Sequence, residues 1–181
     1  SGAEKIDVPF DPLPPIDPSA LIWIDCDGPT EAELGILAEQ LGLYSFVLED
    51  LRHSGQRTKL DHYAEHFHVA FHDCELQIAD GETNLLTREV DLVFADGWLL
   101  SVSQPSEVGD AGHFPIDEVQ SRFDRQRSED GSTDEGFLLW ALLDVLVDRY
   151  FDVGDAVDER LDELQEVVLD DTVDRIRRGR P

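Results

Sequence analysis

The chain has 181 residues, and its 41 Asp and Glu residues against 14 Lys and Arg residues give a formal net charge of −27. This length suffices for one domain with a buried core, with or without an extension. The negative charge excludes nucleic acid as a partner and disfavours an anionic membrane surface, because both need clusters of Lys and Arg. Two interpretations of the acidity remain, namely attraction of metal cations and solubility in a salt-rich cytoplasm.

The cysteine content and the start of the chain bear on its location. Cys26 and Cys74 are too few for a disulfide framework and indicate a reducing, cytosolic compartment. Ser1-Gly2-Ala3 is typical of the remnant of a removed tag, and no signal-peptide pattern follows it. No apolar run approaches the roughly 20 residues that span a bilayer. We therefore expect a soluble chain whose natural start is missing or replaced.

The first third of the chain predicts an arm, a strand and two helices. Residues 1–20 are rich in proline and predict an irregular arm. The short, apolar, β-branched run Leu21–Cys26 predicts a buried strand. A capping-box pattern starts at Thr30 and predicts a helix that Gly42 ends. A short helix is predicted over Phe46–His53, with Ser45 as its cap.

A period of two follows and predicts the rest of a sheet. The predicted strands are Leu60–Tyr63, His66–Ile78, Leu85–Ala95 and Trp98–Gln104. Asp96-Gly97 predicts a hairpin between the last two. His113–Arg127 predicts a helix, and Ser128–Asp134 a polar loop. Residues 21–134 are thus expected to form one α/β domain with helices on both faces of a single sheet.

The segment Phe137–Leu169 predicts a helix of roughly 50 Å, capped by Thr133 or Asp134. An apolar stripe with the spacing of a helix-packing seam comprises Leu143, Val147, Tyr150, Gly154, Val157, Leu161, Leu164 and Val168. An acidic stripe beside it comprises Asp144, Asp148, Asp152, Asp155, Glu159, Asp162 and Glu166. Like charges four residues apart repel by about 0.2–0.5 kcal/mol, so this stripe is either a solvated face or a surface that a cation neutralises. We expect residues 135–181 to form a separate unit, in which residues 170–181 begin another helix.

Five possible zinc ligands have even residue numbers and would share one face of an uninterrupted strand. They are His62, His66, His68, His72 and Cys74. A turn at Ala64-Glu65 would separate the first from the others, and the last three span more than one coordination shell along a strand. The pattern therefore favours strand-surface histidines over a metal site.

The sequence contains no GxSxG, HExxH, CxxC or phosphate-binding glycine loop, so no enzymatic activity is predicted. Three carboxylates suggest a different chemistry. Glu49 and Asp50 lie at the end of the predicted short helix, where the helix dipole disfavours negative charge. With Asp144 of the long helix they offer the oxygen ligands that a hard divalent ion takes. The alternative interpretation is ordinary surface charge.

Four motifs, in this order and spacing, resemble one protein family. They are Trp23-Ile24-Asp25, Leu48-Glu49-Asp50, Gln56-Arg57-x-Lys59-Leu60 and Leu142-Leu143-Asp144-x-Leu146-Val147-Asp148-x-Tyr150-Phe151. From about Leu21 to Leu169 the chain resembles the cytoplasmic amino-terminal domain of CorA-type magnesium transporters. The resemblance implies an αβα sandwich with a central mixed sheet and a long C-terminal helix. It also implies a homopentamer at the cytoplasmic face of the cell membrane that senses Mg²⁺ and closes the pore.

The resemblance also implies the metal ligands. Asp50 matches the aspartate that holds ions between neighbouring subunits, and Glu49 and Asp144 match the positions for a second ion. Without the ion, the carboxylates of two subunits would repel one another and loosen the closed ring. Mg²⁺ is the default ion on family frequency, and Co²⁺ and Zn²⁺ are the alternatives.

The chain departs from the family pattern in several places. The rest of the stalk helix with its second interfacial aspartate, the two transmembrane helices and the Gly-Met-Asn signature are absent, and Thr58 replaces the usual proline. We therefore expect a sensor domain, with a truncated start of the stalk, that transports nothing by itself. A ZntB-like zinc transporter shares the fold and would suit the histidines. A stand-alone acidic interaction module is the alternative from another class.

Overall fold

The computed structural model of the chain describes residues 20–79, 82–105, 111–130 and 134–178. In chain order the elements are β1 (Ile22–Asp27), α1 (Glu31–Leu41), α2 (Ser45–Arg52), β2 (Lys59–His62), β3 (Phe67–Ala79), β4 (Glu82–Ala95), β5 (Trp98–Gln104), α3 (Ile116–Asp130) and α4 (Glu135–Arg178). The proline-rich arm expected at residues 1–20 lies, apart from Ala20, outside the described residues.

The five strands form one mixed sheet in the order β1-β5-β4-β3-β2. Strand β1 runs parallel to β5, with Ile24 opposite Leu100, and the other neighbouring pairs are antiparallel. The hairpin predicted at Asp96-Gly97 joins β4 and β5. Gly97 has a φ of 81°, a left-handed conformation that glycine adopts without steric cost.

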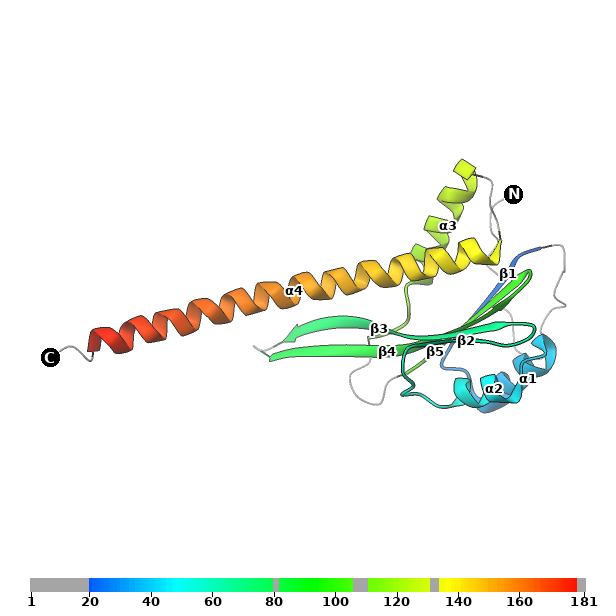
Figure 1. Cartoon of the computed structure of the whole chain (residues 1–181), viewed down its shortest axis with the longest axis horizontal. Coiled ribbons are helices and arrows are strands. Elements are labelled where there is room, and N and C mark those ends of the chain that lie inside the picture. The colour runs from blue at the N-terminus through cyan, green and yellow to red at the C-terminus, as the bar shows by residue number, and fades with distance from the viewer. Residues whose placement is uncertain (1–19, 80–81, 106–110, 131–133, 179–181) are drawn as a thin grey trace.

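Helices cover both faces of the sheet, so the predicted αβα sandwich is confirmed (Figure 1). Alternation along β4 supplies both cores, because successive side chains of a strand point to opposite faces. Leu92 packs with the α3 and α4 side, and Val93 packs with the α1 and α2 side. The smaller core consists of Cys26, Leu34, Leu37, Val47, Leu51, Val93, Leu100 and Val102.

The helix caps agree with the sequence for α1 but not for α2. In α1 the Glu33 amide donates to Thr30 Oγ1 (3.3 Å), and the Thr30 amide donates to Glu33 Oε2 (2.7 Å). The cap of α2 is Tyr44, whose carbonyl accepts from the amide of Leu48 at 3.1 Å. Because this bond starts the helix one residue earlier, Ser45 is its first residue, and the prediction that Ser45 is the cap was wrong.

The two later helices also differ from prediction at their ends. Helix α3 begins at Ile116 rather than His113, because the Pro115 carbonyl accepts the amides of the first turn. It extends to Asp130, so the first residues of the predicted loop at 128–134 are helical, and residues 131–133 lie outside the described part. Helix α4 is capped as predicted by Asp134, whose Oδ1 accepts from the Phe137 amide at 2.8 Å.

Helix α4 is continuous to Arg178, so the separate helix predicted at residues 170–181 was wrong. The physical reason is the absence of glycine or proline between residue 170 and Arg178, which leaves nothing to break the helix. Its first turns pack on the sheet through Leu138, Ala141, Leu142, Val145 and Leu146. Among the described helices, none combines the length and the continuous apolar character that a membrane crossing requires.

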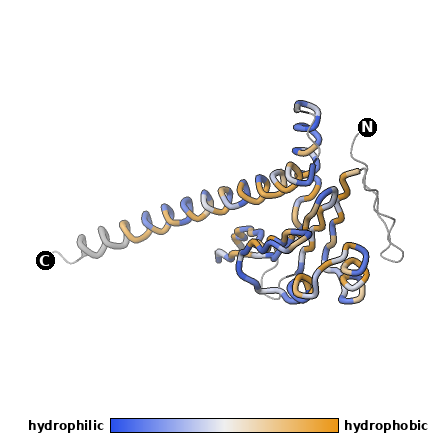
Figure 2. The backbone as a smooth tube through the Cα atoms, turned by 45° about the vertical axis from the view of Figure 1, so that its right-hand side comes forward, coloured by the Kyte–Doolittle hydropathy of each residue, from blue (hydrophilic) through white to orange (hydrophobic). Residues whose placement is uncertain are grey.

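The apolar stripe predicted on α4 is mostly not the face that packs on the sheet. Leu143 touches the core, but Leu161 and Leu164 are each 50% exposed. Figure 2 shows hydrophobic and hydrophilic residues alternating along the helix where it projects beyond the sheet. Two polar contacts mark the place where it leaves the sheet. Arg149 Nε donates to Asp73 Oδ1 at 2.5 Å, and the Tyr150 hydroxyl donates to the His72 carbonyl.

Candidate metal centre

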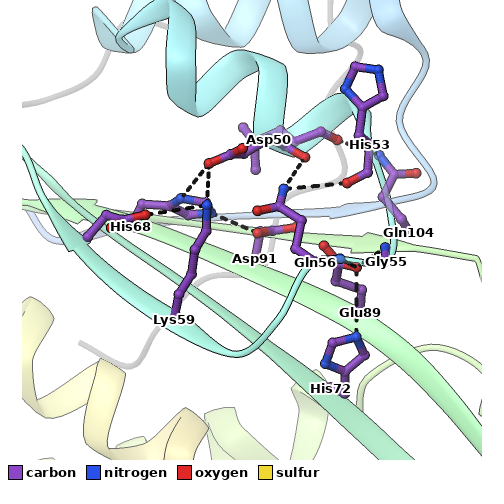
Figure 3. Close-up of polar contacts among 12 residues, drawn as sticks. Asp50, His53, Gly55, Gln56, Lys59, His68, His72, Glu89, Asp91 and Gln104 are labelled. Atoms are coloured by element: carbon purple, nitrogen blue, oxygen red, sulfur yellow. Dashed lines mark hydrogen bonds and ion pairs between the residues drawn. The ribbon is translucent and has the colours of Figure 1, made fainter.

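A cluster of charged side chains lies between α2 and the sheet, at the edge formed by β2 and β3 (Figure 3). Helix α2 is anchored by Val47 and Leu51, which are fully buried. Asp50 follows Val47 by three residues, so it lies at the flank of the buried face of the helix. Its carboxylate therefore points toward the strands, while Glu49 beside it is exposed.

Asp50 contacts two cationic or titratable groups. Its Oδ2 lies 2.5 Å from Lys59 Nζ and 3.6 Å from His68 Nδ1. The Asp50 carbonyl accepts from Gln56 Nε2 at 2.8 Å and from the His53 amide at 3.1 Å. The end of α2 is thus held by the loop that follows it, although the Asp50 side chain remains 27% exposed.

Beneath Asp50 lies a buried pair, His68 and Asp91, on adjacent strands. His68 Nε2 is 2.7 Å from Asp91 Oδ1, and the two side chains are 0% and 1% exposed. Burial raises the pKa of Asp91 above its ordinary value, and the hydrogen bond with His68 acts in the opposite direction. Among the groups around Asp91, the His68 imidazole is the one that most favours the ionised carboxylate.

Glu89, two residues before Asp91 on β4, holds the loop between α2 and β2. Its Oε2 accepts from the Gly55 amide and, at 3.0 Å, from the Gln56 amide. Gly55 has a φ of 92°, which favours glycine and allows both amides to converge on one oxygen. Burial raises the pKa of Glu89, and these amide bonds oppose that rise. His72 Nε2 lies 3.8 Å away from the same oxygen.

The structure brings one predicted ligand, Asp50, together with two groups not predicted to join it. Asp50, Asp61 and His68 each offer a ligand atom, and these atoms lie within 4.8 Å of one another. Asp61 on β2 is opposite His68 on β3 in the register of the hairpin. The signal for this grouping was the shared face of two paired strands, which sequence alone leaves open until the register is known.

Asp144, the third predicted ligand, lies on the opposite face of the sheet from Asp50 and Glu49 (Figure 1). Arg122 of α3 donates to Asp144 Oδ2 and, at 2.6 Å, to Asp148 Oδ2. The hydrogen bond to Asp148, followed by that to Asp144, raises the pKa of Arg122. A guanidinium thus neutralises the start of the acidic stripe, and one chain alone does not bring Glu49 and Asp144 to one ion.

The histidines are not the strand-surface set that the sequence favoured. His66 and His68 are 3% and 0% exposed, because Tyr44 and Tyr63 cover the first and α2 covers the second. His62 is exposed and pairs with Phe67 in the register, so it faces away from His68. The predicted separation of His62 from the others by a turn is confirmed.

The motif Trp23-Ile24-Asp25 has a structural role on the other face. Trp23 Nε1 donates to Ser101 Oγ at 2.9 Å, and the Ser101 hydroxyl donates to Asp25 Oδ1 at 2.5 Å. These bonds connect β1 to β5 across their parallel pairing. Burial raises the pKa of Asp25, and the bond from Ser101 opposes that rise.

The fold places the chain in a class of αβα domains with one long projecting helix. It is similar to the soluble domain of CorA from Methanocaldococcus jannaschii, with a TM-score of 0.55 and 17% identity over 82% of this chain and 56% of that chain. A family model described as "CorA-like Mg2+ transporter protein" matches residues 18–179. The chain therefore belongs to the CorA-like family, which is a family of transporters and not a class of enzymes.

Two curated relatives have similar sequences. The "Cobalt/magnesium transport protein CorA" of Thermotoga maritima is 27% identical over 163 residues, which are 87% of this chain and 43% of the relative. The "Putative metal ion transporter YfjQ" of Bacillus subtilis is 27% identical over 148 residues, or 81% of this chain and 42% of the relative. The chain thus spans less than half the length of these relatives.

Proposed function

We propose that this chain is the cytosolic divalent-cation-sensing domain of a CorA-type Mg²⁺/Co²⁺ transporter, in which cations that bridge neighbouring copies close the pore. The observation that carries this proposal is the family match over residues 18–179, nearly the whole chain. The relative from Thermotoga maritima is named for cobalt and magnesium transport, which supports these two ions as the cargo of the whole protein.

Asp50 is the proposed principal ligand. It is 27% exposed and is neutralised within one chain by Lys59, a flexible side chain that is itself 29% exposed. A divalent ion from solvent could displace this ammonium and attract a carboxylate of a second copy. Glu49 and Asp144 lie on opposite sides of the sheet, so a second ion held by both would need residues of different copies.

The proposed assembly is a homopentamer at the cytoplasmic face of the cell membrane. In this assembly the projecting part of α4 is directed toward the membrane, and its exposed apolar residues, such as Leu161 and Leu164, contact neighbouring copies. The acidic stripe that accompanies them would repel in the absence of cations, which is the physical basis of a cation-dependent closed state.

The test is calorimetric titration of Mg²⁺ into the wild-type chain, Asp50→Asn and a control, Asp158→Asn, at near-physiological salt. The control removes the same charge from an exposed position on α4. We expect Mg²⁺ to bind at least about fivefold more weakly to Asp50→Asn than to the control, because only the first variant loses a ligand. Equal Mg²⁺ affinity in both variants would contradict the role of Asp50.

A further inference from the structure

The two ring nitrogens of His68 have different surroundings. Nε2 is bonded to buried Asp91 at 2.7 Å. Nδ1 has no hydrogen-bond partner among the described residues, although the side chain is 0% exposed. It points toward Asp50, whose Oδ2 is 3.6 Å away (Figure 3), too far for a hydrogen bond. An unsatisfied buried nitrogen costs about 1–3 kcal/mol, so this orientation needs an explanation.

Asp91 supplies part of that explanation. A carboxylate that accepts the proton of one imidazole nitrogen fixes the tautomer and leaves a lone pair on the other nitrogen. With the proton on Nε2, toward Asp91, the lone pair of His68 lies on Nδ1, on the side of Asp50 and Asp61. This is the usual arrangement of a metal-binding histidine, in which the carboxylate behind the ring orients it and increases its basicity.

A cation already contacts the two carboxylates on this side of His68. Lys59 Nζ lies 2.5 Å from Asp50 Oδ2 and 3.3 Å from Asp61 Oδ2. The lysine ammonium is a donor with three N–H groups, yet among the described residues none of them is hydrogen-bonded to His68 Nδ1. Because Lys59 is 29% exposed, its side chain can rotate into solvent and leave the two carboxylates and the imidazole to another cation.

We infer that Asp50, Asp61 and His68 of a single chain form a binding site for a transition-metal dication of the Zn²⁺ type. In this site Asp91 orients the imidazole, and the Lys59 ammonium competes with the metal ion. One nitrogen and two carboxylate oxygens suit Zn²⁺ or Co²⁺, with water as the fourth ligand, whereas Mg²⁺ prefers oxygen ligands alone. In a tetrahedral zinc site ligand atoms lie about 3.3 Å apart. Asp50 Oδ2 and His68 Nδ1, 3.6 Å apart, already have nearly this spacing. The Asp61 ligand atom, on the edge strand β2, lies within 4.8 Å of both.

This site uses the residues of one chain only, so it does not depend on the bridging Mg²⁺ site proposed above, although Asp50 is common to both. A metal held here would remove Asp50 from the interface between copies. Mg²⁺ and a dication of the Zn²⁺ type would therefore compete for the Asp50 carboxylate.

The experiment is a titration of Zn²⁺, and in parallel Co²⁺, into the whole chain with Mg²⁺ present in excess. Asp61→Asn removes a ligand, and we expect it to weaken Zn²⁺ binding at least about tenfold. Lys59→Met removes the competing ammonium, and we expect binding to tighten roughly fivefold or more. Glu75→Gln is the control, because it removes an equal charge from an exposed residue of β3 about 23 Å from His68.

The ligand atom is identified by nuclear magnetic resonance of ¹⁵N-labelled histidine. On Zn²⁺ binding we expect the Nδ1 resonance of His68 to shift while Nε2 keeps its proton. An unchanged His68 resonance, or equal Zn²⁺ affinity in Asp61→Asn and Glu75→Gln, would overturn this inference. Either result leaves the Mg²⁺ titration of Asp50→Asn untouched, so the two proposals fail separately.

Discussion

At the scale of single residues, burial determines which titratable groups have shifted pKa values and so affect stability. His66 lies between Tyr44 and Tyr63, with ring centroids 5.1 Å and 5.2 Å away, and is 3% exposed. Its Nε2 has no hydrogen-bond partner among the described residues. Burial, and to a lesser extent the neighbouring His68, lowers the pKa of His66 below its ordinary value of 6.5. The folded state therefore favours the neutral ring.

This shift predicts a pH effect on stability. Because the pKa of His66 is lower in the folded state, the unfolded chain binds the proton first, and the free energy of unfolding falls as pH decreases below about 6.5. In His66→Phe the ring contacts remain and this loss disappears. We expect the fall in Tm between about pH 7.5 and about pH 5.5 to be smaller in the variant than in the wild type. An identical fall, measured by differential scanning calorimetry, would show that His66 is not responsible.

At the scale of elements, the termini of the helices are set by individual hydrogen bonds. Thr30 and Glu33 exchange side-chain and backbone bonds at the start of α1, whereas Ser45 is already within α2 and Tyr44 lacks a side-chain cap. Thr30 and Ser45 thus lie in similar sequence contexts, but only Thr30 caps a helix.

Thr30→Ala is expected to lower the free energy of unfolding by about 1 kcal/mol, because it removes the cap of α1. Ser45→Ala is the matched control, and we expect a change within about 0.5 kcal/mol, because its side chain caps nothing. Urea unfolding of both variants measures the difference. Equal losses would mean that the Thr30 bonds contribute no more than an exposed hydroxyl.

The elements could be predicted from sequence because their signals are local. The period of two along Leu85–Ala95, the turn at Asp96-Gly97 and the cap at Asp134 each depend on neighbouring residues. The charged cluster could not be predicted in the same way. Asp61 meets His68 only through the register of the β2–β3 hairpin, and Asp91 reaches it only across a second strand pairing.

Which surface covers each face of a helix could not be predicted from the sequence either. The apolar residues from Leu143 to Val168 have the spacing of a packing seam, but the spacing does not identify the partner that covers them. In one chain the sheet covers the neighbouring face, through Leu142 and Leu146, and leaves most of the stripe exposed. Similarly, the acidity of Asp144 suggested a metal, and the structure places Arg122 against it.

At the scale of the whole molecule, charge dominates. With a net charge of −27, two copies repel strongly at low ionic strength, although α4 presents the apolar residues for contact. We expect the chain to be monomeric in low salt and to associate more as millimolar Mg²⁺ or added salt screens the acidic stripe. Multi-angle light scattering measures this directly. A stable pentamer at low salt without divalent ions would contradict the prediction.

Helix α4 is attached to the sandwich at one end only, and Arg149 and Tyr150 make hydrogen bonds with β3 near the point where the helix leaves the sheet. From there to Arg178 a continuous helix extends about 42 Å. A tilt of about 7° at this point displaces the far end by about 5 Å, close to the rise of one helical turn. A change in the tilt of α4 that is too small to disturb the packing of the sandwich therefore produces a large movement at the C-terminal end of the helix.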